Sequence, residues 1–254
     1  MARSHALVAF VSLCALLAGC TSSPQESDVV PPAEAAGCAV PAGLKGQDVA
    51  RLPVTEKVIA LTFDAGANAD AVPSIRATLA RTGVKATFFL SGGFVEKYPL
   101  KSRRLAARDL VGNHTMAHPD LTTLSDTQVS TQVRDAETAI RTTTGEDPRR
   151  FFRFPYGARN THLIGLVNGL CYVPFRWTVD SLGWKGTSGG QSLATVVARV
   201  VGAARPGAIV LMHLGSNPDD GTTLDADALP QIISKLRAKG YRFVRLSQVM
   251  SADP

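Results

Sequence analysis

The hydrophobic residues of this chain fall into short runs. These runs cover residues 58–63, 86–90, 151–154, 172–179, 208–212 and 241–246. Apolar runs of this length, bounded by polar residues, predict buried β-strands. A further short strand is expected just before Asn113, which brings the number to about seven.

Segments with helical spacing separate these strands. Asp70 is the expected cap of the first helix, and Ser125 with Gln128 forms a capping box for a later one. Apolar residues recur at helical intervals at Val72, Ile75 and Leu79; at Val129, Val133, Ala136 and Ile140; at Val196, Val197, Val200 and Val201; and at Leu229, Ile232, Ile233 and Leu236. Alternating strands and helices predict an α/β fold with a parallel sheet, either an open doubly wound sheet or a (β/α) barrel. One domain over residues 51–254 is expected.

The first residues have the pattern of an export signal. A short basic start precedes an apolar stretch over residues 6–18, which as a helix spans about 20 Å, less than the roughly 30 Å of a bilayer core. Residues 1–19 therefore predict a signal peptide. The sequence Leu-Ala-Gly-Cys at its end resembles a bacterial lipobox in which Cys20 receives lipid, although a plain secretory signal can also end in cysteine.

A lipid on Cys20 would hold the exported protein on the outer face of the bacterial cell membrane. Residues 20–50, rich in Ser, Pro, Ala and acidic residues in their first part, are expected to form a flexible tether and an N-terminal arm. Cys38 and Cys171 then remain in an oxidising compartment, which favours a disulfide between them, with two buried thiols as the alternative.

Composition narrows the class of protein. Of 254 residues, 45% are hydrophobic and 19% are charged, which excludes wholesale disorder. The net charge of +6 arises from scattered Arg and Lys residues without a basic run. Such a charge suits nucleic acid and an anionic envelope polymer equally, so charge alone names no partner. We expect no nucleic-acid partner, and no obligate protein partner is evident.

Polar residues follow five of the predicted strands where each strand ends. They are Asp64, the pair His114 and His118, Arg153, Asp180 and His213. Catalytic groups of parallel α/β proteins lie at these ends of the strands. Two histidines four residues apart lie on one side of a helical turn and can share a metal ion. Each residue alone also has a structural explanation, such as a helix cap, a surface cation or a core histidine, but the ordered set favours a site.

This order of motifs resembles the polysaccharide deacetylase family, which is carbohydrate esterase family four with its NodB-homology domain. The motifs are T-F-D-A-G (62–66), H-T-M-A-H (114–118), R-F-P-Y-G (153–157), D-S-L-G-W (180–184) and L-M-H (211–213). The resemblance implies a distorted (β/α) barrel with about seven parallel strands. It also implies hydrolysis of acetyl groups, N-acetyl above all, from an acetylated polysaccharide, assisted by a divalent metal that is usually Zn²⁺.

The resemblance implies a role for each motif residue. His114 and His118 would hold the metal, and Asp64 would be the general base, oriented by Arg153. His213 would protonate the leaving amine. The backbone N–H of Tyr156 would hold the oxyanion, while Trp184 and Leu211 would line the pocket for the acetyl methyl group.

Two positions depart from the family's pattern. Ala65 stands where the family has an aspartate that ligates the metal, so the third ligand is open: Asp70 or Asn68 could reach back, Asp64 could itself ligate, or the two histidines could bind weakly with water. Gly183 stands where the family has an acidic residue that orients the catalytic histidine, and Asp180 is the candidate to replace it.

These departures leave three functions to compare. The first is an active deacetylase of a cell-envelope or extracellular glycan, such as peptidoglycan or a chitooligosaccharide. The others are a non-catalytic carbohydrate-binding lipoprotein on the same scaffold and an amidase that acts on muropeptides.

Overall fold

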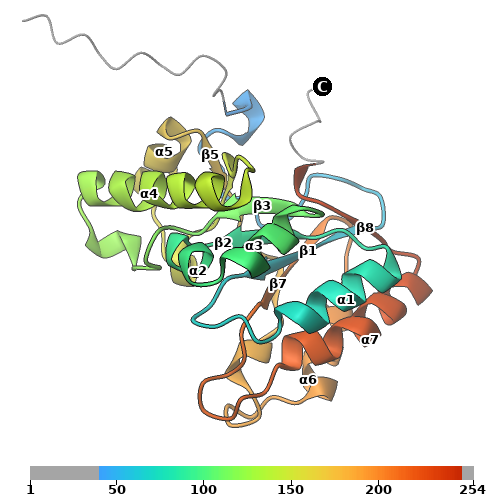
Figure 1. The fold of residues 1–254 in the computed structure, drawn as a ribbon. Coiled ribbons are helices and arrows are strands. Elements are labelled where there is room, and N and C mark those ends of the chain that lie inside the picture. Colours follow the sequence, from blue (N-terminus) through green and yellow to red (C-terminus); the bar gives the residue numbers. More distant parts are fainter. Residues whose placement is uncertain (1–39, 248–254) are drawn as a thin grey trace, which may run out of the picture. The chain divides into compact units, whose positions relative to one another are not determined.

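A computed structural model of the chain describes residues 40–247 (Figure 1). The predicted signal peptide, the lipidation site Cys20 and the disulfide partner Cys38 lie outside these residues, so these predictions stay untested. Within the described part, no helix combines the length and the apolar character that crossing a membrane requires.

The strands form one curved parallel sheet. In chain order they are β1 (Val58–Asp64), β2 (Thr87–Leu90), β3 (Leu110–Asn113), β4 (Arg150–Phe152), β5 (Tyr172–Pro174), β6 (Val179–Asp180), β7 (Ala208–His213) and β8 (Arg242–Val244). Seven of them follow the spatial order β5-β4-β3-β2-β1-β7-β6, and β8 pairs with β1 beside this path. Each of these strand pairs is parallel. The expected distorted (β/α) barrel with about seven parallel strands is confirmed.

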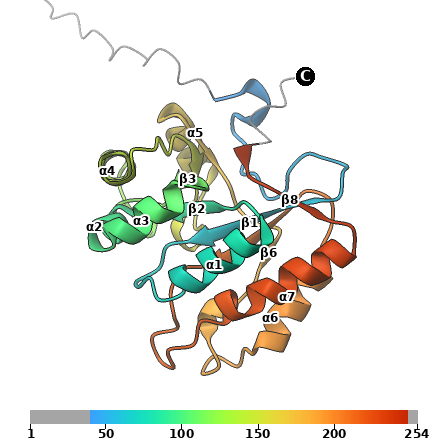
Figure 2. The same ribbon diagram turned by 45° about the vertical axis from the view of Figure 1, so that its right-hand side comes forward.

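Helices cover the outer face of this sheet (Figures 1 and 2). They are α1 (Val72–Thr82), α2 (Gly92–Lys97), α3 (Pro99–Ala106), α4 (Asp126–Thr144), α5 (Thr161–Gly169), α6 (Leu193–Gly202) and α7 (Leu224–Ala238). The predicted capping box begins α4: the Ser125 side chain accepts from the backbone of Gln128, and the Gln128 side chain accepts in return. The apolar stripes predicted from the sequence face the sheet, as the burial of Ile75, Val133 and Ile232 shows.

Side-chain alternation along the strands decides which residues enter the barrel. Ile59, Leu61 and Phe63 of β1 pack into the core under the outer helices, whereas Val58 and Ala60 belong to a separate inner cluster. Because successive side chains point to opposite faces, Asp64 shares the inner face with these even-numbered residues. The end of β1 thus delivers a carboxylate into the barrel.

Two sequence predictions about strand bounds and helix caps are wrong. The run 172–179 is not one strand: it splits into β5 and β6, which lie at opposite ends of the sheet. The split leaves Phe175, Arg176 and Trp177 between the two edges. Asp70 does not cap α1, whose N-cap is Ala71 without a side-chain hydrogen bond. The Asp70 carboxylate instead accepts from Ser216 Oγ at 2.8 Å.

Two residues at the start of the described part form bridges to distant parts of the sheet. Val49 forms a bridge with Phe175 after β5, and Arg51 forms one with Ala208 of β7. Further along the chain, Cys171 is disulfide-bonded. Its pairing with Cys38 stays a prediction, because that partner lies outside the described residues.

Candidate active site

The centre of the site is a buried ion pair inside the barrel. Arg153 Nη1 lies 2.7 Å from Asp64 Oδ1, and the two residues are 1% and 5% exposed. Arg153 also donates to Thr62 Oγ1 and to the carbonyl oxygens of Phe175 and Arg176. These bonds occupy the guanidinium on several sides, so its orientation and that of the carboxylate are fixed.

A ring contact supports the same arginine. Its guanidinium carbon lies 4.1 Å from the centroid of the Phe89 ring, which suits a cation–π interaction. Burial lowers the pKa of Arg153, and the charge of Asp64 opposes this shift. The structure thus places Arg153 where the resemblance implied, against the carboxylate of Asp64.

The two histidines of the second motif lie together, but they are not on a helix. Their ring centroids are 4.7 Å apart. A turn brings them together, in which Thr115 N donates to Asn113 Oδ1 and His118 N donates to Thr115 Oγ1. The expected helical turn is therefore wrong, although the expected proximity is right.

Hydrogen bonding and burial make these imidazoles suitable metal ligands. His114 Nδ1 lies 2.8 Å from the carbonyl oxygen of Arg153, an acceptor, so Nδ1 carries the proton and Nε2 keeps its lone pair. Burial lowers the pKa of His114 to about 4, and burial likewise lowers the pKa of His118. His114 is therefore neutral at pH 7, and the lowered pKa of His118 likewise favours its neutral form.

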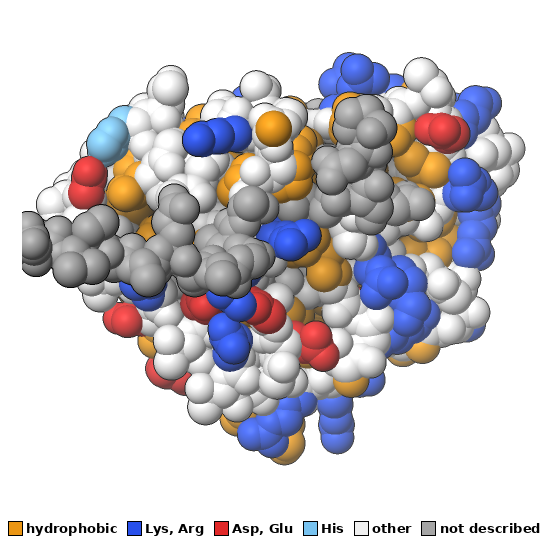
Figure 3. Space-filling model, turned by 90° about the horizontal axis from the view of Figure 1, so that it is seen from above, with side chains coloured by type: hydrophobic (Ala, Val, Ile, Leu, Met, Phe, Trp, Pro, Cys, Tyr) orange, Lys and Arg blue, Asp and Glu red, His pale blue; other side chains and the backbone are white. Residues whose placement is uncertain are grey.

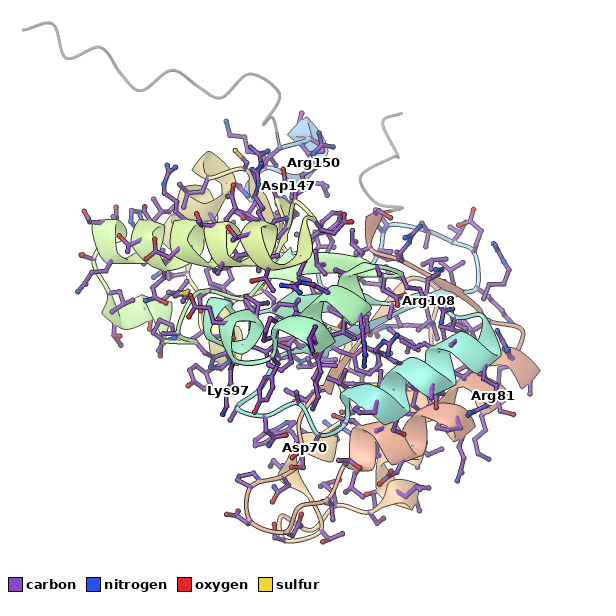
Figure 4. All side chains as sticks on the ribbon, in the orientation of Figure 1. Asp70, Arg81, Lys97, Arg108, Asp147 and Arg150 are labelled. Carbon is purple, nitrogen blue, oxygen red and sulfur yellow. The ribbon has the colours of Figure 1, made fainter. Side chains whose placement is uncertain are left out.

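The third ligand expected from the family's pattern has no ready replacement. Within residues 40–247, no group of three His, Cys, Asp or Glu residues is already arranged to hold a metal. Asn68 and Asp70 both bind Ser216 on the loop after β7, and Figure 4 shows Asp70 on the loop between β1 and α1. Asp64 Oδ2 lies 3.6 Å from His114 Nε2. The Asp64 carboxylate therefore lies beside the histidine pair, within reach of a water molecule held there, but it does not complete a three-residue ligand set.

His213 ends β7 at the position paired with Asp64, and its partner is a residue that the sequence analysis missed. Its Nδ1 lies 3.5 Å from Asp225 Oδ2, and its backbone N donates to the same oxygen at 2.8 Å. Burial lowers the pKa of His213, but the adjacent carboxylate of Asp225, with the charges of Asp64 and Asp180, outweighs burial and raises the pKa overall.

Asp180, the residue expected to assist His213, does something else. Its carboxylate accepts from the backbone N of Leu182 and from Trp184 Nε1, at 2.9 and 3.3 Å. It therefore shapes the loop that carries Trp184. The prediction of Asp180 as the partner of His213 is corrected to Asp225, which only the folding of α7 against this loop brings near.

The remaining predicted pocket residues surround the same centre. Tyr156 is 71% exposed, and its ring lies edge-on to that of His118. The half-exposed Trp184 has its ring centroid 6.2 Å from that of His213. Leu211 is buried on β7, two residues before His213 and on the same face of the strand.

A cavity of about 440 Å³ opens beside His118. Its lining combines small residues with aromatic rings and one lysine: Ala65, Gly66, Ala67, Ser91, Gly93, Phe94, Lys97, Tyr98, Met116, Ala117, His118 and Tyr156. Tyrosine rings beside small side chains leave room for a sugar. Lys97, which Figure 4 shows on α2, donates to the carbonyl of Ala67 across this opening.

Backbone conformation also marks these loops. Thr115, His118, Tyr156 and Leu182 all have positive φ and are four of the six non-glycine residues with this conformation in residues 40–247. Such conformations cost free energy and concentrate at functional sites. The loops that carry the motifs are thus held in unusual shapes.

Comparison with known proteins agrees with this geometry. The family model for polysaccharide deacetylase matches residues 51–173. A peptidoglycan-N-acetylglucosamine deacetylase of Bacillus cereus is 34% identical over 202 residues, which cover 79% of this chain and 71% of that protein. The chain belongs to the polysaccharide deacetylase family. As a polysaccharide deacetylase it is also 30% identical to a chitooligosaccharide deacetylase of Azorhizobium caulinodans, over 76% of this chain and 94% of that protein.

One similar solved structure belongs to a protein without catalytic activity. BA3943 of Bacillus anthracis, described as a CE4 family pseudoenzyme, superposes with a TM-score of 0.73 at 28% identity, over 81% of this chain and 69% of that chain. The fold therefore occurs with and without catalysis. The side chains of the site must decide between the two.

Proposed function

We propose that this polysaccharide deacetylase removes N-acetyl groups from an envelope or extracellular glycan such as peptidoglycan or a chitooligosaccharide. The observation that carries the proposal is the buried Arg153–Asp64 pair, whose free carboxylate oxygen faces the neutral imidazole of His114. Burying a charged pair costs solvation free energy, and folding alone does not require that cost. Two relatives of the chain are named for these two substrates.

Asp64 acts as the general base in the proposed reaction. Arg153 holds Oδ1, which leaves Oδ2 to take a proton from the attacking water. The oxygen of that water forms a bond to the acetyl carbon, and the carbonyl π electrons move to oxygen. The arginine thus holds the carboxylate of the base in a fixed orientation.

His114 and His118 would hold a divalent cation beside Asp64, whose Oδ2 stays free to act as the base. When bound there, such an ion, Zn²⁺ by resemblance, supplies Lewis acidity that polarises the acetyl carbonyl and lowers the pKa of water. The lone pair that His114 keeps on Nε2 and the neutral state of its ring support this assignment.

His213 acts as the general acid. Its raised pKa keeps the imidazole protonated to higher pH than that of a free histidine. As the carbon–nitrogen bond breaks, the amine nitrogen takes a proton from His213, and acetate leaves with the water oxygen. The backbone N–H of Tyr156 would stabilise the oxyanion, and Trp184 and Leu211 would enclose the acetyl methyl group.

The test is release of acetate from N-acetylglucosamine oligomers and from purified peptidoglycan, with and without a chelator. We expect acetate release that stops with the chelator and in the Asp64→Asn and His114→Ala variants, both still folded. Activity that the chelator leaves untouched contradicts the mechanism. Release of peptide instead of acetate indicates an amidase acting on muropeptides.

One specific observation favours a second candidate, a carbohydrate-binding protein without catalysis. Ala65 removes a carboxylate from the metal site, and BA3943 is a pseudoenzyme of the same fold. Glycan binding without acetate release and without bound metal would support this alternative.

We also propose that the protein is exported and held by lipid on Cys20 at the outer face of the bacterial cell membrane. The apolar stretch and Leu-Ala-Gly-Cys sequence support this proposal. Labelling with a radioactive fatty acid in the wild type, and its loss in Cys20→Ala, tests it.

A further inference from the structure

The side chain of Asp225 packs directly against Gly183. A Cβ atom built on Gly183 would lie 2.2 Å from Asp225 Oδ1, 2.6 Å from its Cγ and 3.0 Å from its backbone N. Gly183 does not have positive φ, so its backbone conformation alone would accept other residues. The carboxylate of Asp225 therefore occupies the volume that a side chain at position 183 would need.

The Asp225 carboxylate is buried and held in one orientation. Its Oδ1 accepts from Ser181 Oγ at 2.6 Å, and its Oδ2 accepts from the backbone N of His213 at 2.8 Å. Ser181 Oγ in turn accepts from the backbone N of Gly183. Asp225 also lies in the first turn of α7, where the helix dipole favours a negative charge.

The second contact of Oδ2 is with the imidazole of His213. The distance to Nδ1 is 3.5 Å, and Nδ1 is buried without a closer hydrogen-bond partner in the described part of the chain. A carboxylate beside Nδ1 favours the tautomer or imidazolium with a proton there. Nε2 is then the ring nitrogen that exchanges a proton with the substrate.

We infer that Asp225 is the positioning residue for His213. The absence of a side chain at Gly183 leaves the room in which the Asp225 carboxylate reaches the imidazole from α7. The two positions form a matched pair, so a carboxylate at 183 and one at 225 exclude each other. The inference rests on the proposed function insofar as His213 is the acid. The geometry of the pair does not depend on which glycan is deacetylated.

Exchange variants test the pair. We expect Asp225→Asn and Asp225→Ala to lower kcat at least about tenfold with little change in KM, because they act on the proton donor rather than on glycan binding. The double variant Gly183→Asp/Asp225→Ala, which moves the carboxylate across the contact, should regain much of the lost kcat. Gly183→Asp alone should lower both stability and activity, because the new side chain would overlap the carboxylate of Asp225.

The matched control is Asp227→Asn, an exposed acid in the same first turn of α7. Thermal unfolding of every variant separates loss of fold from loss of orientation. A folded Asp225→Asn protein with unchanged kcat overturns the inference. The inference is also overturned if the double variant Gly183→Asp/Asp225→Ala folds but is no more active than Asp225→Ala.

A second measurement keeps the test valid if the wild type releases no acetate. The ¹⁵N NMR shifts of the His213 ring report which nitrogen carries the proton. We expect protonated Nδ1 in the wild type and in Asp227→Asn, and a changed proton distribution in Asp225→Asn. Identical His213 spectra in all three proteins refute the positioning role. If no acetate is released but the spectra differ as expected, only the proposed activity is refuted.

Discussion

Asp64 and His213 occupy paired positions at the ends of the adjacent parallel strands β1 and β7. Because the strands are parallel and in this register, both side chains enter the same end of the barrel on its inner face. The proposed base and acid are thus neighbours across one strand pair, with a scissile amide to be placed between them. Each is backed by a buried partner of opposite charge, Arg153 or Asp225.

The first prediction concerns the buried ion pair. Arg153→Ala should lower the free energy of unfolding by about 3–5 kcal/mol, since it leaves the Asp64 carboxylate buried and unpaired. Denaturant unfolding measures the change. Arg81→Gln on the exposed end of α1 is the control and should stay within about 0.5 kcal/mol of wild type. A loss of less than 1 kcal/mol would show that Asp64 does not need this partner in the folded state.

The second prediction is a pH dependence with a definite sign. The pKa of His213 is raised above its ordinary value of 6.5 in the folded protein. Its contribution to stability is therefore complete below about pH 6.5 and is lost as pH rises through the folded pKa. The alkaline limb of the kcat profile should likewise lie above pH 6.5 and move to lower pH in Asp225→Asn. An alkaline limb that does not move would separate Asp225 from this titration.

The third prediction concerns metal affinity at the site of the missing ligand. Ala65→Asp should tighten binding of Zn²⁺ at least about tenfold, because a carboxylate oxygen joins two imidazole nitrogens as the third ligand, beside the same cavity. Isothermal titration calorimetry measures this without reference to activity. Ala67→Asp, which adds the same charge to the cavity wall, is the control. Equal gains in both variants would mean that general charge, not ligation, is responsible.

The fourth prediction links packing to the site through Phe89. A Cβ on Gly112 would lie 2.7 Å from the Phe89 ring, which also supports Arg153. Gly112→Ala should therefore destabilise the fold by about 1–3 kcal/mol and reduce acetate release. Gly165→Ala in α5, where nothing lies within 4 Å, should be neutral or stabilising. A Gly112→Ala protein as stable as the wild type would show that the ring moves freely.

Local patterns predicted the elements well because local interactions determine them. The capping box of α4 and the apolar stripes of the outer helices depend on residues a few positions apart. Predictions failed where a contact from elsewhere intervened. Asp70 binds Ser216 instead of capping α1, and the run 172–179 is interrupted because its two halves pair with different strands.

The sequence by itself determined the parallel α/β class, the ordered motif residues at the strand ends, and the absence of a carboxylate at position 65. Those features follow from periodicity and residue type, whereas the barrel was implied by the resemblance to the family. Only the tertiary structure decided that Asp225 partners His213, that a turn joins His114 to His118, and that Asp70 binds Ser216. These depend on α7 and loops distant in the sequence packing into the same small volume, which local spacing does not encode.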